Sequence, residues 1–281
     1  MKITKAIITA ANPHQRTLPL QTVVDQDGEP KSALHIILEE AISAGLSEIA
    51  VVICPGDQEV YATAAGEHRR HVRFIEQANP MGYGHAVYCA RSFTGDDPFL
   101  LMVGDHLYVS RGKQTCARSL VEVAAAQDCS ASAVQATHES LLPYFGAVGG
   151  HLVGNERGLY EIVRVIEKPT PTQAEQELLV PGLRMGHYLC FFGMHVLGPQ
   201  VMQLLAEDLR GNTGSTRVTL SGALSRLAAQ ERYVACELDG RRYDIGVRYG
   251  LLQAQLALAL SSKDRDRILS MLVHLLADTT R

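Results

Sequence analysis

Two aspartates that stand far apart in the chain could together hold a divalent cation. Asp105 follows the apolar run Phe99 to Val103 and a glycine, and Asp244 ends the short segment Arg241 to Asp244. Carboxylates combined with phosphate oxygens form the octahedral oxygen site that Mg²⁺ prefers. Taken singly, either aspartate is equally typical of a helix cap or a solvated turn. The metal hypothesis therefore requires a fold that brings the two together.

A glycine-rich segment from Gln77 to Ala86 could hold a flat nucleobase. It follows a short apolar run, and Gly82 and Gly84 leave room for a planar ring against the backbone. Gln77 offers an amide donor and an amide acceptor that could pair with the edge of a pyrimidine. An ordinary glycine-rich turn is the alternative interpretation of the same residues.

Three later segments are spaced about one strand apart, so we expect them to converge at the far end of a sheet. They are Tyr144 to Gly146, Glu167 to Pro169 and Gly186 to Tyr188. Glu167 could accept hydrogen bonds from sugar hydroxyls, and Lys168 could hold a phosphate. The alternative is a surface Glu-Lys pair that precedes a proline turn.

Short apolar runs alternate with helix-like stretches through the first two thirds of the chain. This pattern predicts an α/β fold with a mixed, mostly parallel central sheet flanked by helices. Ligands of such sheets bind beyond the carboxyl ends of the strands, where the polar residues above are expected. The expected strands are Lys5 to Ala10, Ile49 to Cys54, Val72 to Glu76, Phe99 to Val103, Ser132 to Ala136, one ending at Ile166, Tyr188 to Val196 and Tyr233 to Leu238. The expected helices are Ser32 to Ala44, Asp57 to Ala65, His85 to Ala90, Arg118 to Gln127, Glu175 to Val180, Val201 to Ala206, Thr219 to Gln230, Val247 to Leu260 and Lys263 to Ala277.

The composition is that of a globular protein. Of the 281 residues, 46% are hydrophobic and 20% are charged, and the formal net charge is -4. The short basic cluster Arg69 to Arg73 is diluted by acidic neighbours, so we expect no nucleic-acid partner. The apolar stretch Ala6 to Ala10 is too short for a signal peptide or a membrane span, which predicts a cytoplasmic protein without a membrane partner. The six cysteines include no CxxC pair and are expected to be buried thiols.

In their order along the chain, these segments resemble the sugar-1-phosphate nucleotidylyltransferases, and within that family the bacterial uridylyltransferases that use UTP and glucose 1-phosphate. The similarity extends from Lys5 to about Leu258. The segments that carry it are Gly82 to Ala86, Val103 to Asp105, Phe145 to Gly146, Val165 to Pro169 and Tyr243 to Gly246.

The resemblance implies a Rossmann-like nucleotide-diphospho-sugar transferase fold over residues 1–258. A base and triphosphate half would cover about 1–130, a sugar-phosphate half about 131–258, and a C-terminal helix 259–281. The apolar stripes of the last two expected helices are compatible with a homo-oligomer.

The implied reaction joins UTP and a hexose 1-phosphate, in particular glucose 1-phosphate. A phosphate oxygen of the sugar attacks the α-phosphorus in line, with Mg²⁺ present, and the products are a UDP-sugar and pyrophosphate. The implied catalytic residues are Arg16, Asp105, Lys168 and Asp244, of which Asp105 and Asp244 are the metal ligands. The implied substrate-binding residues are Ala10, Ala11, Gln77, Gly82, Gly146, Glu167 and Gly186.

The segment after the first expected strand departs from the family pattern, which is GxGTR followed by a lysine. Here Asn12 to Leu20 keeps Arg16 but replaces both glycines, and Pro13 removes one amide donor from a potential phosphate cradle. No lysine occurs between Lys5 and Lys31, and the resemblance assigns Lys31 to a non-catalytic position. The absence of a GxGxxG loop argues against an NAD-dependent enzyme.

Two functions therefore remain open from the sequence. The first is an active but divergent uridylyltransferase, which keeps the metal pair, the base loop and the sugar-side motif. The second is a catalytically weakened homologue that binds sugar nucleotides in a regulatory or sensing role.

Overall fold

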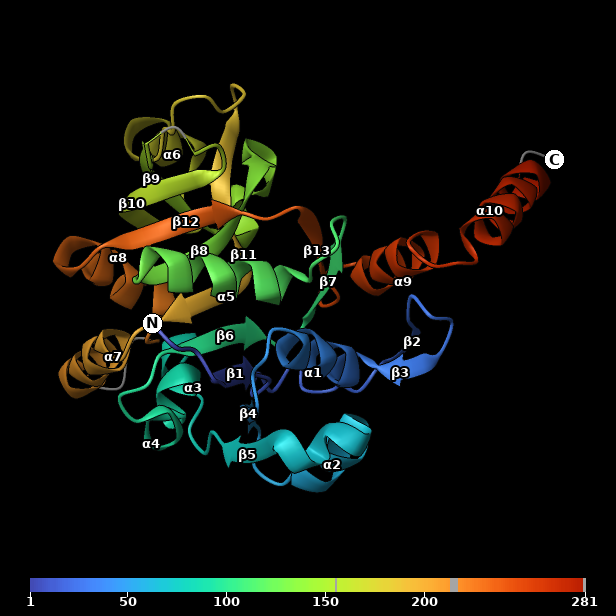
Figure 1. Ribbon diagram of the computed structural model, residues 1–281, viewed down its shortest axis with the longest axis horizontal. Helices are drawn as coiled ribbons and strands as arrows, with labels where there is room; N and C mark the ends of the chain where they lie inside the picture. The colour runs from blue at the N-terminus through green and yellow to red at the C-terminus, as the bar shows by residue number, and fades with distance from the viewer. Residues whose placement is uncertain (155, 213–216, 280–281) are drawn as a thin grey trace.

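The computed structural model describes residues 1–154, 156–212 and 217–279. A central sheet of nine strands crosses the molecule in the order β5-β4-β1-β6-β11-β8-β12-β10-β9, with helices on both faces (Figure 1). Two-stranded sheets are formed by β7 with β13 and by β2 with β3. The strands are β1 Lys5–Thr9, β2 Thr22–Val24, β3 Pro30–Ser32, β4 Glu48–Ile53, β5 Val72–Glu76, β6 Phe99–Val103, β7 His106–Ser110, β8 Ser130–His138, β9 Gly146–Leu152, β10 Leu159–Glu167, β11 His187–Leu197, β12 Tyr233–Glu237 and β13 Gly240–Asp244.

The two halves of the central sheet differ in strand direction. Strands β1, β4, β5 and β6 form a parallel block. Beyond β6, only β8 and β12 run parallel, whereas β11 is antiparallel to β6, β8 and β9, and β10 is antiparallel to β9 and β12. The Rossmann-like α/β fold is confirmed, but the expected mostly parallel order holds only in the N-terminal half. The later strands are joined partly by short returns such as the one between β9 and β10, and short connections produce antiparallel neighbours.

The helices flank the sheet and mostly begin where the sequence predicts. One exception is α6, which begins earlier than the expected Glu175 because Thr170 forms a capping box with Gln173 and Pro171 occupies the first turn. The helices are α1 Ala33–Ser43, α2 Gln58–Ala65, α3 Tyr83–Cys89, α4 Arg91–Thr94, α5 Cys116–Gln127, α6 Pro171–Glu177, α7 Gln200–Gly211, α8 Leu220–Gln230, α9 Gly250–Leu260 and α10 Arg265–Thr279, with 3₁₀ turns η1 Gly66–His71 and η2 Glu139–Tyr144.

Apolar side chains from both faces of the sheet form the core. Ile7 and Ile8 of β1 are fully buried and point to opposite faces. Ile8 lies in the cluster that includes Leu34 of α1 and Leu120 of α5, whereas Ile7 lies in the cluster that includes Leu224 of α8. Both sides of β1 are therefore packed, which fixes the strand whose carboxyl end leads into the site.

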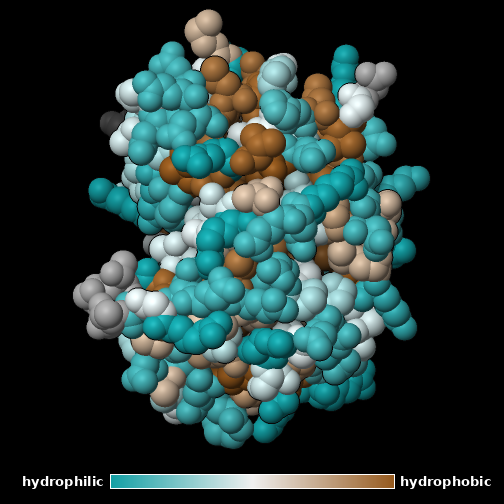
Figure 2. Space-filling view, turned by 90° about the vertical axis from the view of Figure 1, so that its left-hand side faces the viewer, coloured by the Kyte–Doolittle hydropathy of each residue, from teal (hydrophilic) through white to brown (hydrophobic). Residues whose placement is uncertain are grey.

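The surface carries both hydrophilic and hydrophobic side chains. Helix α10 projects from the body, away from the sheet (Figure 1). On the face shown in Figure 2, hydrophobic side chains gather in the upper part of the view, on the same end of the molecule as β9, β10 and α6. Exposed apolar residues of these strands include Leu152 and Val163. Within the described ranges, no helix combines the length and the apolar character needed to cross a membrane.

Candidate functional site

A pocket of about 550 Å³ opens at the carboxyl ends of β1 and β6. This is the position at which open α/β sheets bind ligands. Its wall combines residues that are distant in sequence, including Tyr83, His14 and Arg217. The residues predicted for the site that line the pocket are Ala10, Ala11, Gln77, Gly82, Asp105 and Lys168.

The fold brings Asp105 and Asp244 together. Asp105 follows β6, and the next strand, β7, pairs antiparallel with β13 so that Asp244 stands opposite His106. The amide of Ile245 donates to the carbonyl oxygen of Asp105 at 2.9 Å. Ligand atoms of Asp105, His106 and Asp244 all lie within 4.8 Å of one another. The condition on which the metal hypothesis depends is therefore met.

Both carboxylates of this pair are held by hydrogen bonds, and the surroundings of Asp105 favour its ionised form. Nδ1 of His106 lies 2.9 Å from Oδ1 of Asp105, and the amide of Gly246 donates to Oδ1 of Asp244 at 2.8 Å. Burial by itself would raise the pKa of Asp105, but the hydrogen bond and charge of His106 lower it overall. Two oriented carboxylates fit Mg²⁺, which takes oxygen ligands, and His106 serves as the group that orients one of them.

The segment after β5 forms a fixed wall of the pocket. Nε2 of Gln77 donates to the carbonyl oxygen of Gly82 at 3.2 Å and lies 2.9 Å from Nδ1 of His85. The amide of Val218 donates to the carbonyl oxygen of Met81 at 2.8 Å. Gly82 has a φ of +114°, and a Cβ atom there would lie 2.5 Å from the carbonyl oxygen of Val218. Only glycine fits this position without displacing the neighbouring backbone.

The segment after β1 forms the opposite wall and is built from turns. The amide of Gln15 donates to the carbonyl oxygen of Asn12 at 2.9 Å, and that of Leu18 donates to the carbonyl oxygen of Gln15 at 2.9 Å. The amide of His14 donates to Oδ1 of Asn12 at 3.1 Å, and Pro13 has no amide hydrogen. These three amides are used within the segment and are not free to bind a polyphosphate.

The structure does not place Arg16 in the pocket wall. Its Nε lies 3.7 Å from Oδ2 of Asp57, and its carbonyl oxygen accepts the hydroxyl of Tyr61 at 2.7 Å. Oδ2 of Asp57 is buried and has no hydrogen-bond partner among the described residues, so the guanidinium offsets its charge. Lys168 and Arg217 are the lysine and arginine that line the pocket. Arg217 was not predicted from the sequence, and only its place in the folded pocket identifies it.

The sugar-side expectations divide into two groups. Gly146 and Glu167 are cross-strand neighbours in β9 and β10, as expected. Oε2 of Glu167 accepts the hydroxyl of Ser221 at 2.5 Å. Lys168 has a left-handed φ of +46°, and its amide donates to the carbonyl oxygen of Phe145 at 3.2 Å. A non-glycine residue in this conformation is held there by its surroundings.

Gly186 does not join them, which corrects the expected convergence. It precedes β11 beside Glu139, whose amide donates to its carbonyl oxygen at 2.9 Å. A glycine within β11, Gly193, has a φ of +88°, and a Cβ atom there would lie 3.0 Å from Cγ2 of Val103 and 3.5 Å from Cδ2 of His106. Gly186 lies directly before β11 and Gly193 lies within it, so spacing alone did not distinguish them.

Arg242 is a second basic residue that the sequence did not single out. Strand β13 places its guanidinium 3.9 Å from the centre of the Phe145 ring. Its Nη1 atom is buried and has no hydrogen-bond partner within the described part of the chain. Burial lowers the pKa of Arg242, and the nearby Cys190, Tyr108 and Asp244 act in the opposite direction. A buried cation therefore lies between the acidic pair and the sugar-side segment.

Known proteins share this architecture. The nucleotidyl transferase family model matches residues 16–260. UTP--glucose-1-phosphate uridylyltransferase of Bacillus subtilis (strain 168) is 26% identical, over 98% of this chain and 98% of its own length. UTP--glucose-1-phosphate uridylyltransferase 1 of Streptococcus pyogenes serotype M3 is 28% identical, over 92% of this chain and 90% of its own.

Solved structures agree with that match. A UDP-glucose pyrophosphorylase complexed with UDP-glucose superposes with a TM-score of 0.73 and 22% identity, covering 91% of this chain and 98% of the other. A UTP-bound UGPase from Acinetobacter baumannii gives a TM-score of 0.73 and 23% identity, covering 97% and 99%. The shared fold extends over nearly the whole length of these proteins.

Proposed function

The chain belongs to the nucleotidyl transferase family, and from that membership we propose that it joins UTP to a hexose 1-phosphate, in particular glucose 1-phosphate, with release of pyrophosphate. The meeting of Asp105 and Asp244 beside a pocket that keeps the base loop carries the proposal. The choice of UTP and glucose 1-phosphate is supported by the names of the uridylyltransferase relatives.

The proposed chemistry needs alignment and charge neutralisation rather than a covalent enzyme intermediate. A phosphate oxygen of the sugar forms a bond to the α-phosphorus of UTP while the bond to pyrophosphate breaks in line. Magnesium held by Asp105 and Asp244 would offset negative charge on the phosphate oxygens. Lys168 contacts the sugar phosphate, and Arg217 faces the nucleotide phosphates from the pocket wall.

Recognition of the two substrates is assigned to two adjoining pockets: Gln77 lines the pocket at β1 and β6, whereas Glu167 and Ser221 line a second pocket that shares Thr219 with it. Nε2 of Gln77 is committed to Gly82 and His85, so its Oε1 is the atom that can accept the N–H of a uracil ring. Glu167 accepts hydroxyl groups of the sugar, with Ser221 holding one of its oxygens. Gly146 keeps that carboxylate accessible, because a Cβ atom there would lie 3.1 Å from Oε2 of Glu167.

A second function is favoured by the segment after β1. The amides of His14, Gln15 and Leu18 are used in its own turns, and Arg16 pairs with Asp57 instead of lining the pocket. Losing one electrostatic contact to the transferring phosphates costs about 3 kcal/mol of transition-state stabilisation in comparable sites. The second candidate is therefore a sugar-nucleotide-binding protein with a regulatory or sensing role and little turnover.

One pair of measurements separates the two candidates. Pyrophosphate release is measured with Mg²⁺, UTP and glucose 1-phosphate, and UDP-glucose binding is measured by calorimetry. Release above that of an Asp105→Asn control supports the transferase. Binding of UDP-glucose without release supports the regulatory protein, and the absence of both overturns both. Parallel assays with other nucleoside triphosphates and sugar 1-phosphates test the choice of substrates.

A further inference from the structure

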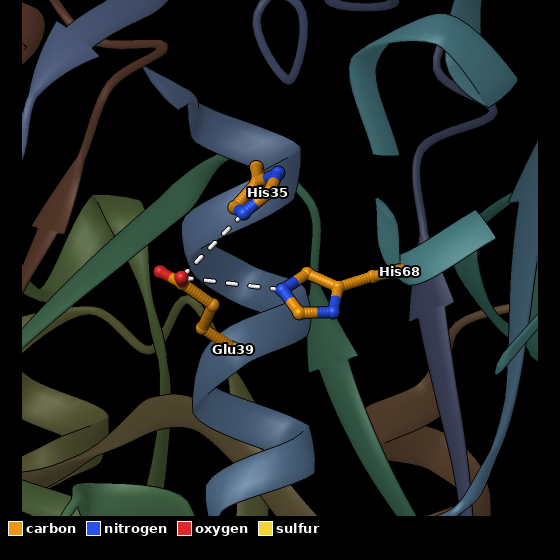
Figure 3. A group of neighbouring side chains, drawn as sticks. All are labelled: His35, Glu39 and His68. Atoms are coloured by element: carbon orange, nitrogen blue, oxygen red, sulfur yellow. Dashed lines mark ion pairs between the residues drawn. The ribbon is translucent and has the colours of Figure 1, made fainter. Parts of the chain in front are cut away.

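A second cluster of metal-ligating side chains lies outside the nucleotide pocket. His35 and Glu39 are one turn apart on α1, and His68 reaches them from η1 (Figure 3). Nε2 of His35 lies 3.5 Å from Oε1 of Glu39, and Nε2 of His68 lies 3.9 Å from the same atom. Ligand atoms of all three residues lie within 4.8 Å of one another.

We propose that His35, Glu39 and His68 bind a transition-metal ion of the zinc class, with a fourth position open to water. Two imidazole nitrogens and one carboxylate oxygen are a ligand set that Zn²⁺ uses when it keeps one open position. Tetrahedral bonds of about 2.0 to 2.1 Å separate the ligand atoms by about 3.4 Å. The distance from His35 to Glu39 is already close to this value, and the distance from His68 requires a shift of only about half an ångström.

The unpartnered nitrogen of His68 points to a missing ligand. Its Nε2 atom is buried and has no hydrogen-bond partner among the residues that the structure describes. The 3.9 Å separation from Glu39 is too long for a hydrogen bond. The two imidazole rings are tilted by 53° with centroids 4.5 Å apart, so they do not stack face to face. A metal ion would satisfy a polar atom that is costly to bury without a partner.

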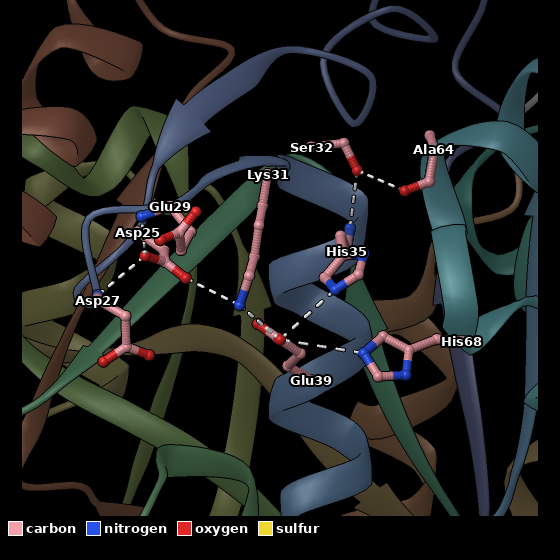
Figure 4. Close-up of polar contacts among 9 residues, drawn as sticks. All are labelled: Asp25, Asp27, Glu29, Lys31, Ser32, His35, Glu39, Ala64 and His68. Atoms are coloured by element: carbon pink, nitrogen blue, oxygen red, sulfur yellow. Dashed lines mark hydrogen bonds and ion pairs between the residues drawn. The ribbon is translucent and has the colours of Figure 1, made fainter.

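The backbone around the cluster positions His35 and leaves room for it. The amide of His35 donates to Oγ of Ser32 at 3.0 Å, and the Ser32 hydroxyl donates to the carbonyl oxygen of Ala64 at 2.7 Å (Figure 4). Gly66 has a φ of +55°, and a Cβ atom there would lie 3.1 Å from Nδ1 of His35. The start of α1 and the end of α2 are thus already joined at this point.

Lys31 is the group that competes with a cation. Its Nζ atom lies 2.7 Å from Oε1 of Glu39 and 2.8 Å from Oδ2 of Asp25 (Figure 4). Asp25 gives Lys31 a second partner, so the ammonium can leave Glu39 without losing every negative neighbour. With Lys31, Glu39 and Asp25 counted together, the two acids exceed the one base, and the net negative charge favours a divalent ion.

The site would tie α1 to the segment that follows α2. Helix α2 carries Tyr61, whose hydroxyl donates to the carbonyl oxygens of Arg16 and Ala10 at 2.7 and 3.3 Å. Metal binding would therefore stiffen the support of the segment after β1 without adding a group to the nucleotide pocket. The inference stands independently of the proposed function, and its main expected effect is on stability.

Calorimetric titration of the metal-free full chain with Zn²⁺ tests the proposal. Excess Mg²⁺ is kept present to occupy the acidic pair at Asp105. We expect one zinc per chain, and about 100-fold weaker binding in His68→Gln and Glu39→Gln, since even outer-shell losses cost up to about 100-fold. His71→Gln, in the same 3₁₀ turn, is the matched control and should bind like wild type. Lys31→Met should bind zinc more tightly, because the competing ammonium is gone.

Two further measurements separate loss of metal binding from loss of folding. Thermal unfolding in chelator shows whether each variant folds, and added zinc should raise the Tm of wild type and His71→Gln but not of His68→Gln. The visible spectrum of the Co²⁺ form of wild type should be that of a four- or five-coordinate ion. Unchanged zinc binding in His68→Gln and Glu39→Gln, or a Co²⁺ spectrum of an octahedral hydrated ion, overturns the proposal.

Discussion

The two walls of the nucleotide pocket are built by opposite means. After β5, Gln77 is held by Gly82 and His85, and backbone hydrogen bonds from Val218 to Met81 and from Gly84 to Val218 fasten the segment to the residues before α8. After β1, the amides of His14, Gln15 and Leu18 donate within the segment itself, and Arg16 is directed toward Asp57 at the start of α2. The first wall, termed the base wall, is residues 77–85. The second, termed the phosphate wall, is residues 11–20.

The difference shows where each wall keeps its polar groups. The base wall commits Nε2 of Gln77 to the protein and leaves its carbonyl group for a ligand. The phosphate wall commits backbone amides that a polyphosphate would need, and Pro13 has none to offer. We therefore expect recognition of the nucleoside to be well preserved and stabilisation of the leaving pyrophosphate to be weak.

The largest expected effect comes from the acidic pair, which serves both walls. Asp105→Asn or Asp244→Asn removes a charged metal ligand and should lower pyrophosphate release by about 1,000-fold, at the upper end of what one electrostatic contact contributes. Asp96→Asn is the control, because the Asp96 side chain is 88% exposed and lies outside the pocket wall. Comparable activity in Asp105→Asn and Asp96→Asn would show that the acidic pair is not the reaction centre.

Substitution of Gly82 tests how rigid the base wall is. Gly82→Ala forces a Cβ atom to within 2.5 Å of the carbonyl oxygen of Val218. It should cost about 2 to 3 kcal/mol of unfolding free energy in urea and weaken UDP-glucose binding at least about tenfold. Gly95→Ala is matched in having a positive φ, +60°, but a Cβ atom there meets nothing within 4 Å. Equal losses of stability and binding in the two variants would mean that backbone strain alone causes them, and not the close approach of residue 82 to Val218.

Acidic pH should loosen the base wall. Because Nε2 of Gln77 also donates to Gly82, Nδ1 of His85 must accept, which requires a neutral ring. Burial lowers the pKa of His85 below 6.5. The contact is therefore complete above pH 6.5 and is lost as the pH falls through the lowered pKa of the folded protein. Uridine has no titrating phosphate, so its affinity reports on the base wall. As the pH falls below 6.5 and through the lowered pKa of His85, we expect uridine affinity to fall about threefold, the loss expected for one hydrogen bond.

The control for this pH effect is His85→Asn. An asparagine carbonyl can accept from Gln77 without titrating in the same interval. Uridine binding by this variant should be independent of pH between about 5 and 7, the range in which histidine side chains titrate. If wild type and His85→Asn show the same pH dependence, another group controls the base wall.

The sequence was sufficient for the base wall and insufficient for the phosphate wall, for a physical reason. Gln77, Gly82 and Asp105 follow apolar strands whose positions the hydrophobic pattern determines, so their place at the sheet edge could be predicted. The direction of Arg16 depends on turns between Asn12 and Leu18, in which no apolar periodicity indicates where a side chain points.

Strand pairing explains two other differences between expectation and structure. β13, Gly240–Asp244, is polar and only partly buried, so no apolar alternation predicted its pairing with β7. Gly186 lies directly before β11 and Gly193 lies within it, and the register of β11 against β6 and β8 decides which of them lies beside His106. Long-range register is set by tertiary contacts and is weakly encoded in a single strand.

Returning one amide to the phosphate wall should raise activity by a moderate amount. Pro13→Gly restores a backbone donor beside the pocket, and a hydrogen bond to a charged group contributes about 1.5 to 3 kcal/mol. The added freedom of glycine offsets about 1 kcal/mol of this gain. We expect pyrophosphate release to rise about fivefold, with little change in uridine binding. Pro19→Gly, which alters the same kind of residue in the same pocket wall, is the control. An equal response of the two would attribute the gain to flexibility and not to the donor.

The smallest effect on activity is expected at Arg16, the one element of the family loop that the sequence preserves. Its side chain is 49% exposed and pairs with Asp57 outside the pocket wall. Arg16→Ala should change pyrophosphate release by less than about twofold, but it should cost about 1 to 3 kcal/mol of unfolding free energy, because it leaves the buried Oδ2 of Asp57 without its cation. Arg217→Ala removes a charge of the same type from the pocket wall itself and should reduce release more. If Arg16→Ala instead abolishes release while the fold is unchanged, Arg16 must leave Asp57 when substrates bind. The base wall would then be organised before substrates bind and the phosphate wall only when they bind, and both walls would supply groups that bind the nucleotide.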